Sequence, residues 1–113
     1  MKVISTEKAP SAIGPYSQAV VSGNLLYTSG QIPIIPETGE LAQGLEAQAH
    51  QVFRNLAALL KAAGSDMSHA VKTTVFIKNM ADFAAINAVY AQYFSEPYPA
   101  RSCAEAAEDY LSG

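Results

Sequence analysis

The first third of the chain alternates short apolar runs with turn residues. The runs Gln18–Val21 and Leu25–Ser29 flank the dipeptide Gly23-Asn24. Gly and Asn tolerate the positive φ angles that tight hairpin turns require, so this pattern predicts a β-hairpin. A further apolar run at Ile32–Ile35 precedes the turn sequence "PETG" at Pro36–Gly39. That order predicts a third strand, and with it a β-meander.

The spacing of apolar residues changes in the middle of the chain. In "EAQAHQVFRNLAALLKAAG" they recur every three or four positions and form one broad stripe, made of Ala49, Val52, Phe53, Leu56, Leu59, Leu60 and Ala63. This spacing predicts an amphipathic helix. Gly64 stands where the residue after a helix C-cap belongs, so the helix is expected to end there.

Alternation with a period of two returns in "AVKTTVFIKN" and predicts a strand with Val71, Thr73, Val75 and Ile77 on one face. A second helix is expected to open at Asn79, with Asp82 completing a variant of the capping box. Its apolar face consists of Phe83, Ile86, Tyr90, Tyr93 and Phe94. The segment "PARSCAE" is expected to form the next strand, although "AEAAEDYL" alone would also suit a helical turn.

The predicted order is a meander, then helix, strand, helix and strand. Two helices packed on one face of a mixed, mostly antiparallel sheet is the α+β arrangement that buries such elements. A chain of 113 residues is expected to form a single domain, residues 1–113. Thr74 and Phe76 lie on the second face of the sheet, and no third layer is predicted to cover them. That face is therefore expected to pack against another subunit.

Composition narrows the classes of partner and compartment. The net charge is −3, and the seven basic residues stand singly along the chain, so nucleic acid is not an expected partner. One cysteine excludes an intrachain disulfide and suits a reducing compartment. The start does not resemble a secretory signal, and no apolar run approaches the roughly 18 residues of a membrane helix. We expect a cytoplasmic protein without membrane contact.

The well-known catalytic constellations are not found in the sequence. His50 and His69 have no Cys or His near enough for a metal site, so no metal is expected. Ser29 lacks the Gly-x-Ser-x-Gly context of a nucleophile elbow. What remains is a set of small groups at the ends of the predicted elements: Tyr16, Ser29, Gly30, Asn87, Arg101 and Cys103. Taken singly, each of them except Arg101 is explained by ordinary packing.

Arg101 differs because of its neighbours in the predicted strand. In an extended strand Arg101, Cys103 and Glu105 share one face. If that face is enclosed, the guanidinium requires a carboxylate, which either the protein or a ligand supplies. The alternative to a ligand is an ion pair with Glu105, two residues away.

Four segments together identify a family. The strings "APSAIGPYSQAV", "YTSGQIP", "AVKTTVFIKNMADFAAINAVY" and "YPARSC" resemble the RidA (YjgF) family, nearly collinearly from about Ala9 to Cys103. The resemblance implies a chorismate-mutase-like α+β fold and homotrimers with a cleft at each subunit interface. It also implies the hydrolysis of reactive 2-enamine and 2-imine acids, such as 2-iminobutanoate and 2-iminopropanoate, to 2-oxo acids and ammonia. These substrates are released by pyridoxal-phosphate enzymes, and the hydrolysis itself uses no cofactor.

The resemblance also assigns roles to the candidate residues. Arg101 would bind the substrate carboxylate through a bidentate pair, and the backbone N–H of Cys103 would help hold the same end together with Gly30. Tyr16, Ser29 and Asn87 would line the pocket and position water or the substrate nitrogen. Because an iminium carbon is already electrophilic, orientation and a polarised water could suffice for hydrolysis.

The chain departs from the family after "ARSC". Family members usually continue to a final strand whose glutamate is thought to orient the hydrolytic water, whereas this chain reads "AEAAEDYLSG". Glu105 matches a different family glutamate. The departure implies a missing or altered C-terminal strand, a tail rearranged as a helix over Ala104–Leu111, or a truncated or frame-shifted sequence. It keeps a second function open, that of a non-catalytic trimeric module that binds small carboxylates. The acidic charge argues against a ribonuclease or translation inhibitor.

Overall fold

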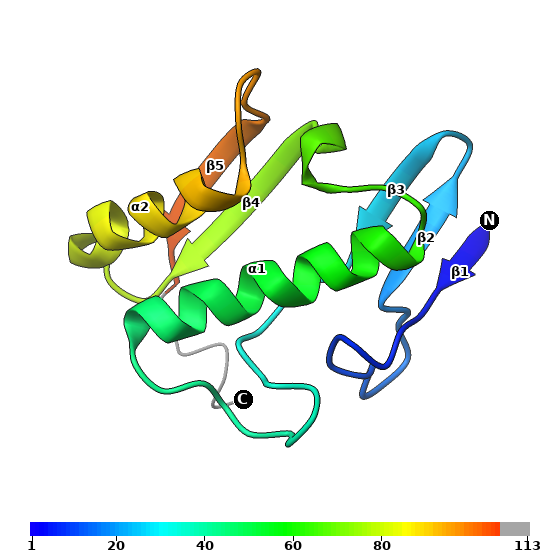
Figure 1. The fold of residues 1–113 in the computed structure, drawn as a ribbon, viewed down its shortest axis with the longest axis horizontal. Helices are drawn as coiled ribbons and strands as arrows, with labels where there is room; N and C mark the ends of the chain where they lie inside the picture. Colours follow the sequence, from blue (N-terminus) through cyan, green and yellow to red (C-terminus); the bar gives the residue numbers. More distant parts are fainter. Residues whose placement is uncertain (107–113) are drawn as a thin grey trace. The chain divides into compact units, whose positions relative to one another are not determined.

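The computed structural model describes residues 1–106, which divide into two compact units (Figure 1). The first unit spans Met1–Asp66 and the second begins at Met67. The first contains β1 (Lys2–Ile4), β2 (Ala19–Ser22), β3 (Leu25–Thr28) and α1 (Leu45–Ala62). The second contains the 3₁₀ turn η1 (Met67–His69), β4 (Lys72–Ile77), the 3₁₀ turn η2 (Met80–Asp82), α2 (Phe83–Tyr93) and β5 (Ala100–Glu105). The predicted α+β class is confirmed.

The hairpin in the first unit is confirmed. Strands β2 and β3 pair antiparallel, with Ser22 opposite Leu25 and Val21 opposite Leu26. Gly23, in the turn between them, has a φ of 61°, which a residue with a Cβ rarely adopts. Strand β1, which the sequence pattern did not predict, pairs with the free edge of β2 and completes an antiparallel sheet in the order β1-β2-β3.

The predicted third strand at Ile32–Ile35 is wrong. Within the described residues this segment makes only an isolated bridge between Ile34 and Leu41. Prolines at positions 33 and 36 remove two backbone donors, which prevents a continuous ladder. The buried amide of Asn55 on α1 binds the segment instead, donating to the carbonyls of Ile32 at 3.1 Å and Ile34 at 2.9 Å. The turn predicted at Pro36–Gly39 is confirmed, since Gly39 N donates to Ile35 O at 2.8 Å.

Helix α1 forms as predicted and covers one face of the three-stranded sheet. Leu59 is fully buried and joins a core cluster with Ile4, Ala9 and Ala19, against which Val21, Leu26 and Ala63 pack. The helix ends in a Schellman motif, because Ser65 N donates to Leu60 O at 2.8 Å and Gly64 N to Lys61 O at 3.0 Å. Gly64 has the positive φ of 79° that this motif requires.

The two strands of the second unit pair in parallel, not antiparallel. Strand β4 aligns with β5 so that Thr73 lies opposite Arg101 and Val75 opposite Cys103. A parallel pair needs a crossover connection, and α2 provides it (Figure 1). The Tyr90 hydroxyl lies 2.9 Å from Thr73 Oγ1, which ties α2 to the inner face of β4.

The start of α2 differs in detail from the prediction. Asn79 Oδ1 accepts a hydrogen bond from Ala81 N at 2.9 Å, so Asn79 caps η2, and α2 follows from Phe83. The Asp82 side chain makes no capping hydrogen bond, so the capping-box variant does not form. A short 3₁₀ turn separates Asn79 from the α-helix, and this moves Asp82 out of the register that a capping box needs.

Both sheets have one apolar face that the described residues leave exposed. In β4, Thr74 and Phe76 are exposed as predicted, with Phe76 exposing 54% of its surface. In the first unit, Val3 and Tyr27 project from the sheet face opposite α1 and each expose 57%.

Some expectations concern the end of the chain. Ala104 and Glu105 belong to β5, so the alternative of a helix starting at Ala104 is wrong at its first residues. The rest of that segment, and the expectation of a missing final strand, lie outside the described residues. Within residues 1–106, no helix has both the length and the apolar character needed to span a bilayer.

Candidate functional site

Arg101 is the centre of the candidate site in the second unit. It lies in β5, opposite Thr73, and its side chain projects toward α2. Its Nη1 donates to Asn87 Oδ1 at 2.6 Å. The guanidinium carbon also lies 4.6 Å from the centroid of the Tyr90 ring and 5.4 Å from that of Phe83. Cation–π contacts at such distances are favourable, so three side chains hold this arginine in place.

Helix α2 supplies all three of these side chains because of their spacing. Phe83, Asn87 and Tyr90 stand at positions i, i+4 and i+7, which places them on one face of a helix. Tyr90 is itself fixed: its ring stacks on Phe94 at 4.3 Å, and its hydroxyl contacts Thr73. Contacts with Phe94 and Thr73 therefore position the ring on which the guanidinium rests.

The partners of Arg101 leave its charge available. An amide and two aromatic rings are neutral, and Asn87 accepts only one of the five N–H donors of the guanidinium. The remaining donors can bind a carboxylate in the planar, bidentate geometry that arginine favours. A hollow of about 480 Å³ opens beside it, lined by Asn87, Tyr90, Ala91, Tyr98, Pro99 and Arg101. One cation among walls that combine polar groups with aromatic and aliphatic side chains suits a small acid.

The alternative of an ion pair between Arg101 and Glu105 is not formed in the described residues. Glu105 Oε1 instead accepts from Met80 N at 3.0 Å and so holds η2 against the end of β5. The condition of an enclosed face is not met within the described chain, because Arg101 is exposed. Solvation of the guanidinium removes the need for an internal carboxylate. Cys103, two residues along β5, is a half-buried free thiol.

The other predicted site residues lie in the first unit. Ser29 Oγ donates to Ser17 O at 2.6 Å, which holds the residue after Tyr16 beside Ser29 and Gly30. Tyr16 follows Gly14, whose φ is 131°, and its hydroxyl accepts from Ile13 N at 3.3 Å. Gly30 is exposed, and a Cβ there would meet nothing within 4 Å. The structure thus joins Ser29 to the Tyr16 segment in one unit and Asn87 to Arg101 in the other.

Sequence reasoning missed the roles of Tyr90, Phe83 and Tyr98. The sequence pattern assigns the first two only to the apolar face of the second helix. Their spacing to Asn87 was a usable signal, because it places two rings beside the one amide on that face. Tyr98 lies in the connection before β5, where no periodic pattern could indicate its contact with the hollow.

His50 lies next to an acidic side chain on the same helix. His50 Nε2 lies 3.9 Å from Glu46 Oε1, one turn earlier on α1. In residues 1–106 no three His, Cys, Asp or Glu side chains are grouped so that they could hold a metal ion.

Comparison with known proteins shows to which family the chain belongs. The model of the endoribonuclease L-PSP family, which includes RidA and YjgF, matches residues 6–109. The chain belongs to the RidA family. The resemblance drawn from four sequence segments is thereby confirmed, and the match includes every candidate residue of both units.

Individual relatives agree with the family match. The chain is 51% identical over 109 residues to the 2-iminobutanoate/2-iminopropanoate deaminase of Escherichia coli, covering 94% of this chain and 85% of that one. A crystal structure of RidA from the Antarctic bacterium Psychrobacter sp. superposes with a TM-score of 0.94 at 46% identity, covering 97% and 89% of the two chains. A structure of Escherichia coli TdcF with bound serine gives 0.92 at 43% identity, with coverage of 97% and 89%.

Proposed function

We propose that this RidA-family chain hydrolyses 2-imino acids of the 2-iminobutanoate and 2-iminopropanoate type, together with their enamine tautomers. The products are the corresponding 2-oxo acid and ammonia. The observation that carries the proposal is the Arg101 cluster, in which a guanidinium held by Asn87 and Tyr90 borders a hollow of about 480 Å³ and uses one of its five donors among the described residues. The relative named for this reaction, at 51% identity, supports the substrate class.

The reaction is balanced without an external reagent. Water adds to the imine carbon and gives a carbinolamine, and this expels ammonia as the C=O bond forms. The carbon is electrophilic once its nitrogen is protonated, so the protein has to orient the substrate and a water molecule. An arginine that grips the carboxylate supplies the orientation, because a bidentate pair fixes the plane of the acid.

We propose a role for each residue from the family resemblance and, for Asn87, from its contact. Arg101 binds the carboxylate, and the backbone N–H of Cys103 and Gly30 are assigned to the same end of the substrate. Asn87 was expected to position water or the substrate nitrogen, but its carbonyl oxygen accepts from Arg101. We therefore propose that Asn87 orients the arginine. Tyr16 and Ser29 keep the proposed role of positioning water or the substrate nitrogen.

The coupled assay for this function generates the imine in place. A threonine dehydratase releases 2-aminocrotonate, which tautomerises to 2-iminobutanoate, and 2-oxobutanoate is followed by its absorbance under conditions where uncatalysed hydrolysis is slow. We expect the protein to raise the rate of oxo-acid formation in proportion to its concentration. A rate equal to that in buffer, combined with calorimetric binding of 2-oxobutanoate, would instead establish the non-catalytic carboxylate-binding module.

We also propose a homotrimeric assembly of single domains that each span residues 1–113. The exposed apolar faces around Phe76 in one unit and Val3 and Tyr27 in the other support a subunit interface, and the family match runs through both units. Light scattering should give three times the 12.0 kDa chain mass. A monomeric mass would reject the assembly. The single cysteine supports a cytoplasmic location, which cell fractionation would test.

A further inference from the structure

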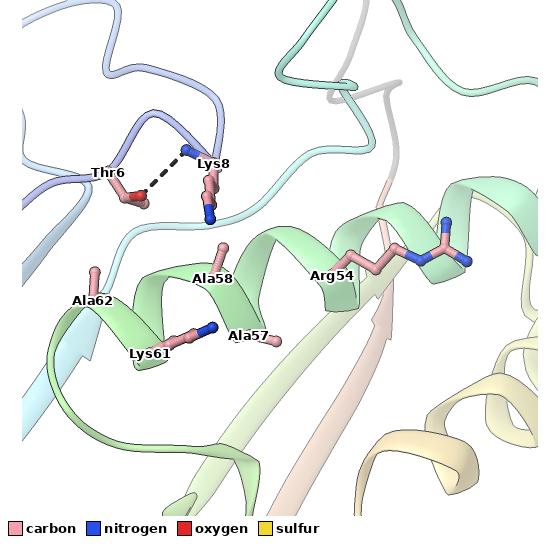
Figure 2. Close-up of a pocket in the computed structure, with 7 residues that line it drawn as sticks. All are labelled: Thr6, Lys8, Arg54, Ala57, Ala58, Lys61 and Ala62. Atoms are coloured by element: carbon pink, nitrogen blue, oxygen red, sulfur yellow. Dashed lines mark hydrogen bonds between the residues drawn. The ribbon is translucent and has the colours of Figure 1, made fainter.

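A second hollow lies within the first unit, on the exposed side of α1 (Figure 2). Its volume is about 430 Å³. Three cations border it: Lys8 from the segment between β1 and β2, and Arg54 and Lys61 from α1. They are three of the seven basic residues in a chain whose net charge is −3. None of the described lining residues is acidic, and Glu7, next to Lys8, does not line the hollow. We call this site the α1 hollow.

The spacing along α1 creates the open floor. Arg54, Ala58 and Lys61 stand at positions i, i+4 and i+7, so they share one face of the helix. The short side chains of Ala57 and Ala58 leave space between the two long cations. Figure 2 shows the Lys8 side chain directed toward α1, while the Lys61 side chain lies along the helix near Ala57. The third cation, Arg54, extends away from the other two.

The backbone that carries Lys8 is held rigidly. The buried Gln18 donates to the carbonyls of Thr6 at 3.1 Å, Ala9 at 3.3 Å and Pro10 at 2.7 Å, and its Oε1 accepts from Thr6 N at 2.8 Å. Thr6 Oγ1 in turn accepts from Lys8 N at 3.2 Å, as Figure 2 shows. The wall opposite α1 is therefore preorganised, which lowers the ordering entropy that a ligand must overcome.

The three cationic groups have no partner among the described residues. Among residues 1–106, no hydrogen bond or ion pair reaches Lys8 Nζ, Lys61 Nζ or the Arg54 guanidinium. Positive groups around one hollow repel each other and concentrate a positive potential there. A ligand with two or more negative charges relieves this repulsion, whereas a single carboxylate neutralises only part of it.

We propose that the α1 hollow binds the phosphate group of a small phosphorylated molecule. A phosphate monoester carries close to two charges at neutral pH and offers three strong acceptor oxygens. Two ammonium groups act on it as point charges, and a guanidinium can add a planar pair of donors. This proposal goes beyond the deaminase function and does not depend on it, because Arg101 is not among the residues that line the α1 hollow.

Calorimetric titration of the full chain tests the site with three probes: inorganic pyrophosphate, glycerol 3-phosphate and a nucleoside 5′-diphosphate. The test variant is Lys8→Gln/Lys61→Gln, and the control Lys2→Gln/Lys78→Gln removes the same charge from exposed positions outside the hollow. We expect the test variant to lose at least about tenfold in affinity and the control less than about twofold. The probe that binds most tightly shows whether the hollow prefers an inorganic or an organic phosphate.

Four outcomes overturn the proposal. One is the absence of binding heat for every probe at low ionic strength. Another is an equal loss of affinity in the test and control variants, which would show that affinity depends only on the net charge of the protein. The third is loss of binding in Arg101→Ala, which would show that the phosphate binds at Arg101 and not in the α1 hollow. A short RNA that binds with affinity increasing with length, while pyrophosphate does not bind, would assign the hollow to nucleic acid and also reject the proposal.

Discussion

Two hollows of similar size present opposite arrangements of positive charge. Beside α2, one guanidinium is fixed by an amide and two rings and borders about 480 Å³. Beside α1, three cations without described partners border about 430 Å³. In the first hollow a single positive charge is held in one orientation. In the second hollow three positive charges are brought together, but their side chains are not held in one orientation.

The difference predicts different kinds of selectivity. A neutral, rigid environment around Arg101 favours ligands whose carboxylate matches its plane, so shape and geometry should decide affinity. Flexible ammonium groups recognise charge more than shape, so affinity for the α1 hollow should fall steeply with salt. The predictions below test this contrast, beginning with the largest expected effect.

Replacing Arg101 should nearly abolish recognition of small 2-oxo acids. Arg101→Ala removes a bidentate, charge-assisted pair, for which we expect a loss of at least about 100-fold in affinity for 2-oxobutanoate. Isothermal titration calorimetry measures it directly. The matched control is Lys72→Ala, which removes a cation from the outer face of the same two-stranded sheet, where it contacts Ser102. Equal affinity in wild type and Arg101→Ala would reject the carboxylate clamp.

Removing the Gln18 amide should destabilise the first unit. Gln18→Leu leaves the carbonyls of Thr6, Ala9 and Pro10 without their shared donor, and we expect a loss of about 2–3 kcal/mol in the free energy of unfolding. Urea denaturation measures it. The control Gln48→Leu loses a single bond to Ala42 O, for which about 1 kcal/mol is expected. If both variants lose the same amount, Gln18 is not the anchor of the segment that carries Lys8.

Changing the partner of the arginine should separate geometry from charge. Asn87→Asp keeps an acceptor beside Arg101 but adds a negative charge that competes with the ligand carboxylate for the guanidinium, so we expect about tenfold weaker binding of 2-oxobutanoate. Asn87→Ala leaves the charge and loses only the orientation, for which about threefold is expected. Tighter binding in Asn87→Asp than in Asn87→Ala would show that charge competition at Arg101 is unimportant.

The smallest effect is expected at the platform below the arginine. Tyr90→Phe keeps the ring beneath the guanidinium and removes the hydroxyl contact with Thr73. The free energy of unfolding should fall by about 1 kcal/mol while affinity for 2-oxobutanoate stays within about twofold. Tyr90→Leu also removes the cation–π contact and should weaken binding further. Identical affinity in Tyr90→Phe and Tyr90→Leu would show that the ring at position 90 does not contribute to binding at Arg101.

The pattern of apolar and turn residues predicted the elements that depend mainly on residues close together in the sequence. The Gly23-Asn24 hairpin, the α1 stripe and the β4 alternation each follow from side-chain periodicity and turn chemistry. The strand predicted at Ile32–Ile35 is wrong because Asn55, 21 residues after Ile34, binds the carbonyls of Ile32 and Ile34 in place of a strand partner. The parallel pairing of β4 with β5 also depends on a crossover that local periodicity does not encode.

The site was predictable only where a motif identified the residue. Arg101 and Asn87 were found through family segments, yet their mutual hydrogen bond was not, because it joins residues of different elements. The basic residues that stand singly in the sequence include three that line one hollow. Folding brings Lys8 to α1 through the amide of Gln18, a contact that charge patterning along the chain cannot reveal.

The most direct test of the account compares the rate of 2-oxobutanoate formation in the coupled dehydratase assay for wild type, Arg101→Ala and Lys72→Ala. The account predicts acceleration over buffer by wild type and by Lys72→Ala, and the buffer rate for Arg101→Ala. Acceleration by Arg101→Ala equal to that by wild type would contradict the claim that this arginine holds the substrate for hydrolysis.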